Sequence, residues 1–571
     1  MKWKGRFEGY HLQSLQKDCI SSLIVGIIAI PLGMAFAIAS GVKPEYGLYT
    51  TIIAGILISL AGGSRLQIGG PTGAFVPILF GIVVQYGYEN LLIAGILAGI
   101  LLILMGLLKL GALIHYIPRP VTIGFTAGIA VIIFSGQIAN FLGLSDIEKH
   151  EAFIANMKEI VLHLGSVNPY SVITASLCLA LILITPRVLP KVPGSLIGLV
   201  LSSVAATIFF DGQVATIGST FGRIPSTLPA FHIPDITLDR VVQLLNPALV
   251  IAVLGGIESL LSAVVADGMT GDRHNSNREL IGQGVANVIT PLFGGIPATG
   301  AIARTATNIK SGAVSPISGM LHGLVVLLVL LLFAPYAARI PLASIAPILM
   351  VVAWNMSERA HFAHTLRTRS GDSIVLLITF ALTVFVNLTV AVEAGLVLAM
   401  ILFVKRMSDS LTVAKVLPNR SGRQEKLEAA TVTDNHDCPQ ISIITIEGSL
   451  FFGAASAFEE SIRRLIREDP NIVLLRMGLV PHIDTTGEAK LAKLVKACKN
   501  QNKLVLVSGL QFQPKEILQR TGLAATIGPV HMFERTGDAI AYALARVEPN
   551  KCVGCRHYAF RECEQLSERT P

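Results

Sequence analysis

Two glycine-rich stretches far apart in the chain have related sequences: Gly69-Gly70-Pro71-Thr72-Gly73-Ala74 and Gly294-Gly295-Ile296-Pro297-Ala298-Thr299-Gly300-Ala301. Each leads into a short apolar segment interrupted by Gly or Pro, about 71–86 and about 300–309. Matching interrupted segments in two halves of a chain are typical of membrane folds whose halves meet at a binding site. The alternative is that the glycines merely allow helices to pack closely.

The composition around these stretches predicts a membrane protein. Of 571 residues, 52% are hydrophobic and 14% are charged, whereas soluble domains carry about 25% charged residues. A helix needs roughly 20 apolar residues to cross a bilayer. The chain offers about fourteen candidate spans: 18–40, 47–62, 71–86, 91–108, 120–141, 171–186, 192–210, 245–265, 279–293, 300–309, 315–336, 341–355, 371–388 and 390–405.

The apolar runs divide the chain into parts. We expect a cytoplasmic N-terminal segment 1–17, a transmembrane domain 18–407, a linker 408–439, a soluble α/β domain 440–547 and a tail 548–571. With both termini in the cytoplasm, Lys and Arg favour the cytoplasmic links by about three to one, which fits the positive-inside rule. Seven spans separate the two glycine-rich stretches, so the halves are inverted relative to each other.

The net charge of +8 is explained by this asymmetry and does not indicate nucleic-acid binding, because no basic stripe with interleaved aromatic residues is present. The chain also lacks the Gly-x-x-x-x-Gly-Lys-Ser/Thr pattern of ATP-binding loops. We therefore expect neither an enzyme nor a primary pump, and we expect no cofactor.

The interrupted segments predict an anion site. A helix that begins inside the membrane directs unpaired N–H groups and a partial positive charge at whatever lies beyond it. Thr72 and Gly73 would begin one such helix, and residues 301–303 the other. Arg304 could complete the site through bidentate hydrogen bonds. Alternatively, Arg304 reaches an interface or pairs with a structural carboxylate.

Glu258 lies in an otherwise apolar span, with Ser262 one helical turn further on. An ionisable residue within a span is costly to bury and is a functional candidate. Glu258 could take up a proton, coordinate sodium or balance the charge of Arg304. In the first span, Phe36 follows a helix-loosening Pro31, and it either lines a binding cavity or packs against lipid or protein.

Longer motifs resemble one known family. Ile30-Pro31-Leu32-Gly33-Met34-Ala35-Phe36-Ala37, then Pro44-Glu45-Tyr46-Gly47-Leu48-Tyr49-Thr50, residues 69–74 and residues 256–284 are similar to sulfate permease (SulP) signatures. The resemblance implies fourteen spans in two inverted seven-helix repeats, core and gate domains, a homodimer and an anion site between the third and tenth helices. By position it assigns Phe36, Thr72, Gly73, Ala303 and Arg304 to the anion, and Glu258 and Ser262 to the coupling ion.

The resemblance also bears on the substrate. The bicarbonate branch tends to have Asp at the position of Glu258 and Thr at that of Ser262, which puts sodium coupling in doubt here. Residues 256–261, 301–304 and 352–357 look more like the bacterial branch that includes an aerobic dicarboxylate transporter. That branch favours proton symport of sulfate or a C4-dicarboxylate across the bacterial inner membrane. Sodium-coupled bicarbonate transport, an anion channel or exchanger, and a membrane-anchored sensor are the alternatives.

The C-terminal region alternates predicted strands (441–446, 471–476, 503–508) with an amphipathic helix at 456–467. Its motif Ile483-Asp484-Thr485-Thr486-Gly487 resembles a STAS domain, which implies a possible cytoplasmic protein partner. Asp484, Thr485 and Thr486 could form a phosphorylation site or simply cap a helix. The tail residues Cys552, Cys555, His557 and Cys563 have the side-chain types of zinc ligands, and a redox role or a free thiol tail are the alternatives.

Overall fold

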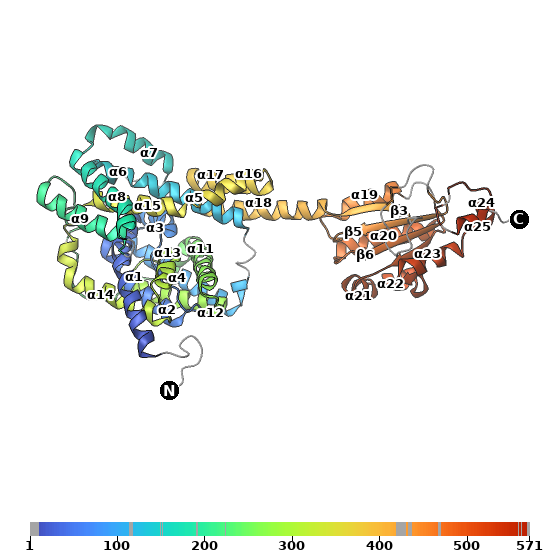
Figure 1. The fold of residues 1–571 in the computed structure, drawn as a ribbon, viewed down its shortest axis with the longest axis horizontal. Coiled ribbons are helices and arrows are strands. Elements are labelled where there is room, and N and C mark those ends of the chain that lie inside the picture. The colour runs from blue at the N-terminus through green and yellow to red at the C-terminus, as the bar shows by residue number, and fades with distance from the viewer. Residues whose placement is uncertain are drawn as a thin grey trace. The chain divides into compact units, whose positions relative to one another are not determined.

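The computed structural model describes residues 11–112, 118–148, 150, 152–189, 192–222, 224–417, 430–431, 437–465, 470–557, 559–560 and 562–567. Residues 1–10 of the expected N-terminal segment and 418–429 and 432–436 of the expected linker lie outside these ranges. The chain forms two compact units, Met1–Ala399 and Met400–Pro571 (Figure 1).

The first unit is built from helices and two short strands, and its last helix, α18, continues past Ala399 into the second unit. In chain order they are α1 (Leu12–Ala39), α2 (Pro44–Ala61), β1 (Gly69–Gly70), η1 (Gly73–Phe75), α3 (Val76–Tyr86), α4 (Tyr88–Leu107), α5 (Arg119–Gly136), α6 (Ile138–Leu142), α7 (Phe153–Leu162), η3 (Leu164–Ser166), α8 (Pro169–Val188), α9 (Gly194–Phe209), α10 (Ile217–Phe221), α11 (Leu238–Thr270), α12 (Ser276–Ile289), η4 (Thr290–Phe293), β2 (Thr299–Gly300), α13 (Ile302–Lys310), α14 (Ile317–Ala337), α15 (Leu342–Met356), α16 (Arg359–Arg367), α17 (Gly371–Phe385) and α18 (Leu388–Asp409).

Every expected span contains a helix, while α7, α10 and α16 lie outside the expected spans. Within the described ranges, seven helices are long and apolar enough to cross a membrane: α1, α2, α4, α5 with α6, α8, α11 and α14. Shorter apolar helices occupy Gly73–Tyr86, Gly194–Phe209 and Gly371–Phe385. This arrangement is consistent with fourteen spans, and the count itself stays a prediction.

Local signals set several helix ends. The hydroxyl of Thr237 accepts a hydrogen bond from the backbone N–H of Arg240 at the start of α11, and Gly271 ends that helix at a φ of 79°. The Asn275 side chain accepts the Arg278 N–H at 3.0 Å and begins α12. These are ordinary N-cap and C-cap arrangements.

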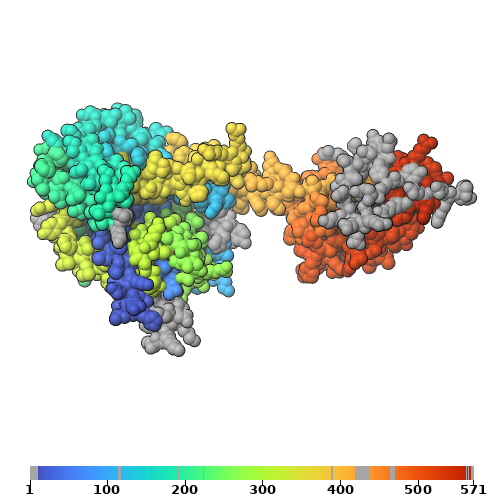
Figure 2. All heavy atoms as spheres, viewed as in Figure 1, coloured from blue at the N-terminus to red at the C-terminus, as the bar shows by residue number. Residues whose placement is uncertain are grey.

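The helices of the first unit pack in two groups. The group that carries both interrupted segments contains α1, α2, α3, α4, α11, α12, α13 and α14. The second group contains α5, α6, α8, α9, α15, α16 and α17. Helices about 300 residues apart meet in the first group: the blue surface of α1 lies against the yellow-green surface of α14 (Figure 2). These groups correspond to the expected core and gate.

The second unit is an α/β domain with a six-stranded sheet of order β4-β3-β5-β6-β7-β8. Its strands β5 to β8 are parallel, and β3 pairs antiparallel with β5 and β4. Its elements are β3 (Thr412–Leu417), β4 (Ala430–Thr431), β5 (Ile441–Glu447), α19 (Ala455–Leu465), β6 (Ile472–Leu479), α20 (Thr485–Asn500), β7 (Leu504–Ser508), α21 (Phe512–Arg520), α22 (Leu523–Ile527), η5 (Pro529–His531), β8 (Met532–Phe533), α23 (Thr536–Leu544), α24 (Pro549–Cys552) and α25 (Cys563–Ser567).

The three expected strands and the amphipathic helix are present in this domain as β5, β6, β7 and α19. The segment expected as a linker, however, contributes β3 and β4 to the sheet. Residues 412–417 are too few and too polar at one end to stand out as a strand, and their pairing with β5 is what makes them one.

Candidate functional site

The two glycine-rich stretches meet in space. Gly69 and Gly70 of β1 pair antiparallel with Gly300 and Thr299 of β2. Each short strand runs into a helix start, η1 with α3 on one side and α13 on the other. The first backbone N–H groups of such helices have no intrahelical acceptor and carry partial positive charge. The pairing therefore places two positive helix ends at one site inside the first unit.

Arg304 lies in the first turn of α13 and is 3% exposed. Its Nη2 donates to the carbonyl oxygen of Pro71 in the opposite half. In the described part of the chain, its Nη1 has no hydrogen-bond partner. Gly70 allows this close packing, because a Cβ on Gly70 would lie 2.6 Å from Nη1. A buried guanidinium with an open N–H group is suited to binding an anion.

Glu258 of α11 faces the same segment. Its Oε2 accepts a hydrogen bond of 2.8 Å from the Thr72 hydroxyl, and the side chain is half-buried. Arg304 and Glu258 are thus bonded to adjacent residues, Pro71 and Thr72. No direct ion pair joins the two charges within the described ranges.

Apolar side chains from both helix groups lie around the start of η1. A Cβ placed on Gly73 would lie 3.3 Å from Cε1 of Phe36, 3.4 Å from Cδ1 of Ile133 and 2.8 Å from Sδ of Met356. Phe36 comes from α1, Ile133 from α5 and Met356 from the last residue of α15. The helix start that carries Gly73 therefore lies between core and gate.

The other two expected residues occupy different places. Ser262 is buried, and its hydroxyl lies 3.1 Å from the Thr305 hydroxyl, which in turn accepts the Ile68 N–H at 3.0 Å. Ser262 thus joins a hydrogen-bond network at the β1–β2 pair, whereas Glu258 is bonded to Thr72. Ala303 is exposed in the first turn of α13.

A second buried carboxylate in the core, Glu279 of α12, has a different environment. Its Oε2 accepts the backbone N–H groups of Gly63 at 2.7 Å and Ser64 at 2.9 Å, and its Oε1 accepts bonds from Ser259 and Gln283. Asp18 of α1 is bonded in a similar way by residues 314 and 315. These carboxylates accept several hydrogen bonds each, whereas among the described residues Glu258 accepts a hydrogen bond from the Thr72 hydroxyl alone.

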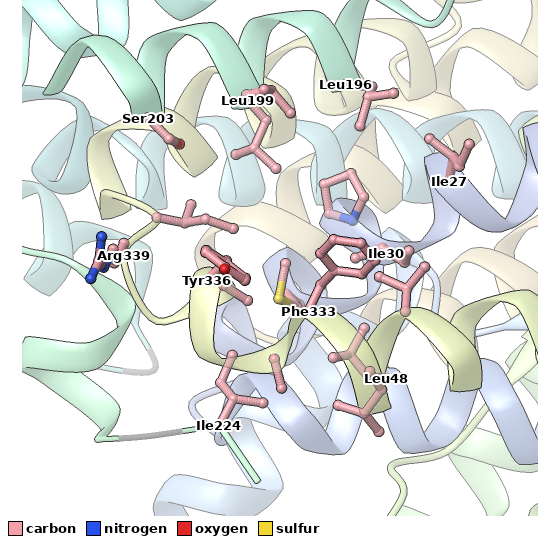
Figure 3. Close-up of a pocket in the computed structure, with 18 of the residues that line it drawn as sticks. Ile27, Ile30, Leu48, Leu196, Leu199, Ser203, Ile224, Phe333, Tyr336 and Arg339 are labelled. Carbon is pink, nitrogen blue, oxygen red and sulfur yellow. The ribbon is translucent and has the colours of Figure 1, made fainter. Parts of the chain in front are cut away.

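A large apolar cavity lies elsewhere in the first unit. It has a volume of about 570 Å³ and is lined almost wholly by apolar side chains of α1, α9 and α14. Figure 3 shows Ile27 at one end of it and Arg339 with Tyr336 at the other. A cavity with so little polar lining cannot replace the hydration of an anion, so we do not assign the anion to it.

In the second unit, Asp484 is the N-cap of α20. Its Oδ1 accepts the Gly487 N–H at 2.7 Å and its Oδ2 accepts the Phe452 N–H at 2.8 Å. Thr485 and Thr486 are exposed in the first turn. The capping role is therefore present, and both hydroxyls are accessible, so phosphorylation stays a prediction.

The tail residues Cys552, Cys555, His557 and Cys563 line one small cavity. Cys438, which looked isolated in the sequence, lines the same cavity. Across the described ranges, no three His, Cys, Asp or Glu side chains already stand as a metal-ligand group. Burial raises the pKa of the Cys438 thiol to about 11. The metal site stays a prediction.

Sequence reasoning missed several residues of these sites. Met356 lies within the motif 352–357, where its place at the end of a span was a usable signal. Glu279 is a carboxylate at the start of an expected span, which was a signal as well. Ile133 lies in a plain apolar run and Cys438 more than a hundred residues before the tail, so neither had a local signal.

Comparisons with known proteins agree with this architecture. Residues 15–379 match the Sulfate permease family and residues 430–539 match the STAS domain. YvdB of Bacillus subtilis (strain 168), named as a candidate sulfate transporter, is 56% identical over 534 residues, which cover 94% of this chain and 99% of that protein.

Solved structures show the same fold. The murine Slc26a9 anion transporter in its inward-facing state matches with a TM-score of 0.85 at 17% identity, over 94% of this chain and 93% of that one. The transmembrane domain of a cyanobacterial bicarbonate transporter, BicA, matches with a TM-score of 0.60 at 29% identity, over 68% of this chain and 98% of that one. With its interrupted helices paired through β1 and β2 and its C-terminal STAS domain, this chain belongs to the sulfate permease family of multi-pass membrane anion transporters.

Proposed function

We propose that the protein is a proton–anion symporter that carries sulfate or a C4-dicarboxylate. The anion would bind between the starts of η1 and α13, held by Arg304 and the backbone N–H groups of Gly73 and Ala303, with Phe36 beside it. The observation that carries this proposal is the buried guanidinium of Arg304, one of whose nitrogens has no protein partner within the described ranges.

Charge balance at the site supports coupling to a proton. Arg304 contributes one positive charge, and each helix start adds about half a charge. An ionised Glu258 would cancel much of this and repel a divalent anion. Protonation of Glu258 removes the repulsion, so proton and anion binding strengthen each other by thermodynamic linkage. Thr72 can bond the carboxyl in either state, because a hydroxyl both donates and accepts.

The donor set around Glu258 favours a proton over sodium. A hard cation needs several oxygen ligands, and the hydroxyl of Ser262 is bonded to Thr305. Sodium-coupled bicarbonate transport is the second candidate, favoured by the 29% identity to the cyanobacterial bicarbonate transporter BicA of Picosynechococcus over 562 residues. An anion channel or exchanger is the third.

Uptake by proteoliposomes separates these candidates. The purified chain is tested with radiolabelled sulfate, succinate, bicarbonate and chloride, each with and without an inward pH or sodium gradient. We expect saturable accumulation of sulfate or succinate that requires the pH gradient. Accumulation driven by sodium would select bicarbonate-type transport, and flux that never exceeds equilibrium would select a channel.

Glu258→Gln tests the coupling role. We expect the variant to lose the acid stimulation of uptake, because an amide cannot exchange a proton. His322→Gln is the control, since His322 is another buried titratable residue of the core, on α14. Acid stimulation that persists in Glu258→Gln would contradict the assignment.

The family likeness also supports a homodimer with both termini in the bacterial cytoplasm and a cytoplasmic protein partner for the STAS domain. The excess of Lys and Arg on one set of links supports the orientation. Cysteine-accessibility labelling in intact cells, with a single cysteine at the C-terminus, tests it, and cross-linking in membranes tests the dimer.

A further inference from the structure

The tail beyond α23 folds back onto the sheet of the second unit. Ala559 and Phe560 are each 2% exposed and belong to the hydrophobic cluster on the β5–β6 side. The Gln440 side chain, just before β5, accepts the Glu548 N–H at 2.8 Å and donates to the Glu548 carbonyl at 3.1 Å. The described part of the tail is therefore a folded part of this domain.

This folding gathers four of the seven cysteines around one cavity of about 20 Å³. Cys438 precedes β5, Cys552 ends α24, Cys555 follows it and Cys563 begins α25. A volume of this size holds about one water-sized occupant. It suits a single ion and is too small for an iron–sulfur cluster.

N–H groups point at the sulfurs of this cluster. The Phe560 backbone N–H donates to Cys563 Sγ at 3.3 Å, and Gln440 Nε2 donates to Cys552 Sγ at 3.3 Å. A neutral thiol is a weak acceptor. N–H donors aimed at sulfur are what metal-bound thiolates use as their outer shell.

The spacing of the tail cysteines matches a metal-ligand turn. Cys552 and Cys555 are separated by two residues, and the Cys555 N–H donates to the Cys552 carbonyl at 3.0 Å. Gly554 within this turn has a φ of 71°, a conformation that favours glycine. Pairs of cysteines with this spacing supply half of the ligands in many structural zinc sites.

We propose that Cys438, Cys552, Cys555 and Cys563 hold one Zn²⁺ as a tetrahedral four-thiolate site that fastens the tail to the start of β5. The ion would draw the four sulfurs together around the cavity that they line. Lys551, which also lines the cavity, would offset part of the negative charge of such a centre.

Metal content of the full-length chain in detergent tests this proposal. After incubation with ZnSO₄ and gel filtration, we expect about one zinc per chain by elemental analysis. Cys438→Ser and Cys563→Ser should each lose this zinc. Cys19→Ser and Cys498→Ser are the controls and should keep it, because Cys19 is exposed on α1 and Cys498 is buried on another face of the same domain.

The wild-type chain gives a second readout that does not depend on how the variants fold. Zinc should protect the four cysteines from alkylation, as counted by mass spectrometry, and a chelator should expose them. Substitution by Co²⁺ should produce the intense thiolate-to-metal absorption of a tetrahedral sulfur site. A chain that binds no stoichiometric zinc would overturn the proposal. Purified protein in which the four cysteines are paired as disulfides would overturn it as well.

Discussion

The guanidinium of Arg304 is almost fully buried. Its Nη2 is bonded to Pro71, and its Nη1 has no partner in the described part of the chain. Such an arrangement is costly unless an anion completes it. The neighbouring helix starts add positive charge without adding side chains. The anion site that we propose therefore consists of one guanidinium and two helix starts.

Arg304→Ala should weaken anion binding by about 10- to 100-fold, because a hydrogen bond to a charged group contributes about 1.5–3 kcal/mol. The anion affinity of Arg304→Lys should lie between those of wild type and Arg304→Ala. The ammonium group keeps the charge but lacks the planar donor arrangement of the guanidinium. Binding of sulfate and succinate to the purified protein by calorimetry measures both. Arg339→Ala, at an exposed position two residues after the end of α14, is the matched control. Unchanged affinity in Arg304→Ala would remove the assigned role.

Glu279 has a structural role that its contacts make explicit. Glu279→Ala should destabilise the core by about 2–5 kcal/mol, because the N–H groups of Gly63 and Ser64 would stay buried without an acceptor. Glu279→Gln keeps one carbonyl oxygen for those N–H groups and should be milder. The apparent melting temperature in detergent measures the difference, and equal melting of Glu279→Ala and wild type would refute it.

Helix packing in the core depends on glycine at the crossing of α4 and α12. A Cβ on Gly284 would lie 2.6 Å from the carbonyl oxygen of Gly99, and one on Gly99 would lie 2.7 Å from that of Gly284. Backbone atoms cannot move aside as a flexible side chain can. The two helices therefore approach closely only because neither residue has a side chain there.

Gly284→Ala should force α4 and α12 apart and cost about 1–3 kcal/mol, as overpacking does elsewhere. We expect a lower melting temperature. We also expect slower uptake, because a shift of α12 would also move Glu279. Gly136→Ala on α5 is the control, because a Cβ there would meet nothing within 4 Å. If Gly284→Ala were as stable as the control, α4 and α12 could move apart without loss of stability, and the prediction would be wrong.

The whole molecule consists of two compact units with separate chemistry. The proposed anion site lies within the first unit, and the cysteine cavity lies within the second. Because β3 belongs to the sheet of the second unit, a truncation that spares residues 412–417 would leave an unpaired strand. The end of α18 at Asp409 is the better boundary.

Truncation after Asp409 should leave saturable, pH-dependent uptake measurable in proteoliposomes, because every residue assigned to the anion precedes that point. The rate can fall if the STAS domain regulates transport. The amount of reconstituted protein is matched between samples by quantitative gel. Complete loss of uptake by a truncated chain that still folds would favour the sensor interpretation over a transporter.

Much of this protein follows from local sequence. The apolar runs determined where the helices of the first unit lie, and the repeated glycine-rich stretches predicted two interrupted segments, because span length and backbone freedom are local properties. Phe36 and Thr72 were expected near the site from the sequence motifs. Glu258 was expected there because burying an ionisable residue within a span is costly. The alternation of strands and helices in the second unit was likewise readable from hydrophobic patterning.

The partners of these segments were decided only by the tertiary structure. The pairing of Gly69 with Gly300, the arrival of Met356 and Ile133 beside Gly73, and the meeting of Cys438 with the tail each join residues far apart in the chain. Hydrophobic periodicity specifies which face of an element is buried, but it carries no information on which distant element will cover that face. That choice depends on shape complementarity and on satisfying buried polar groups, which exist only once the chain has folded.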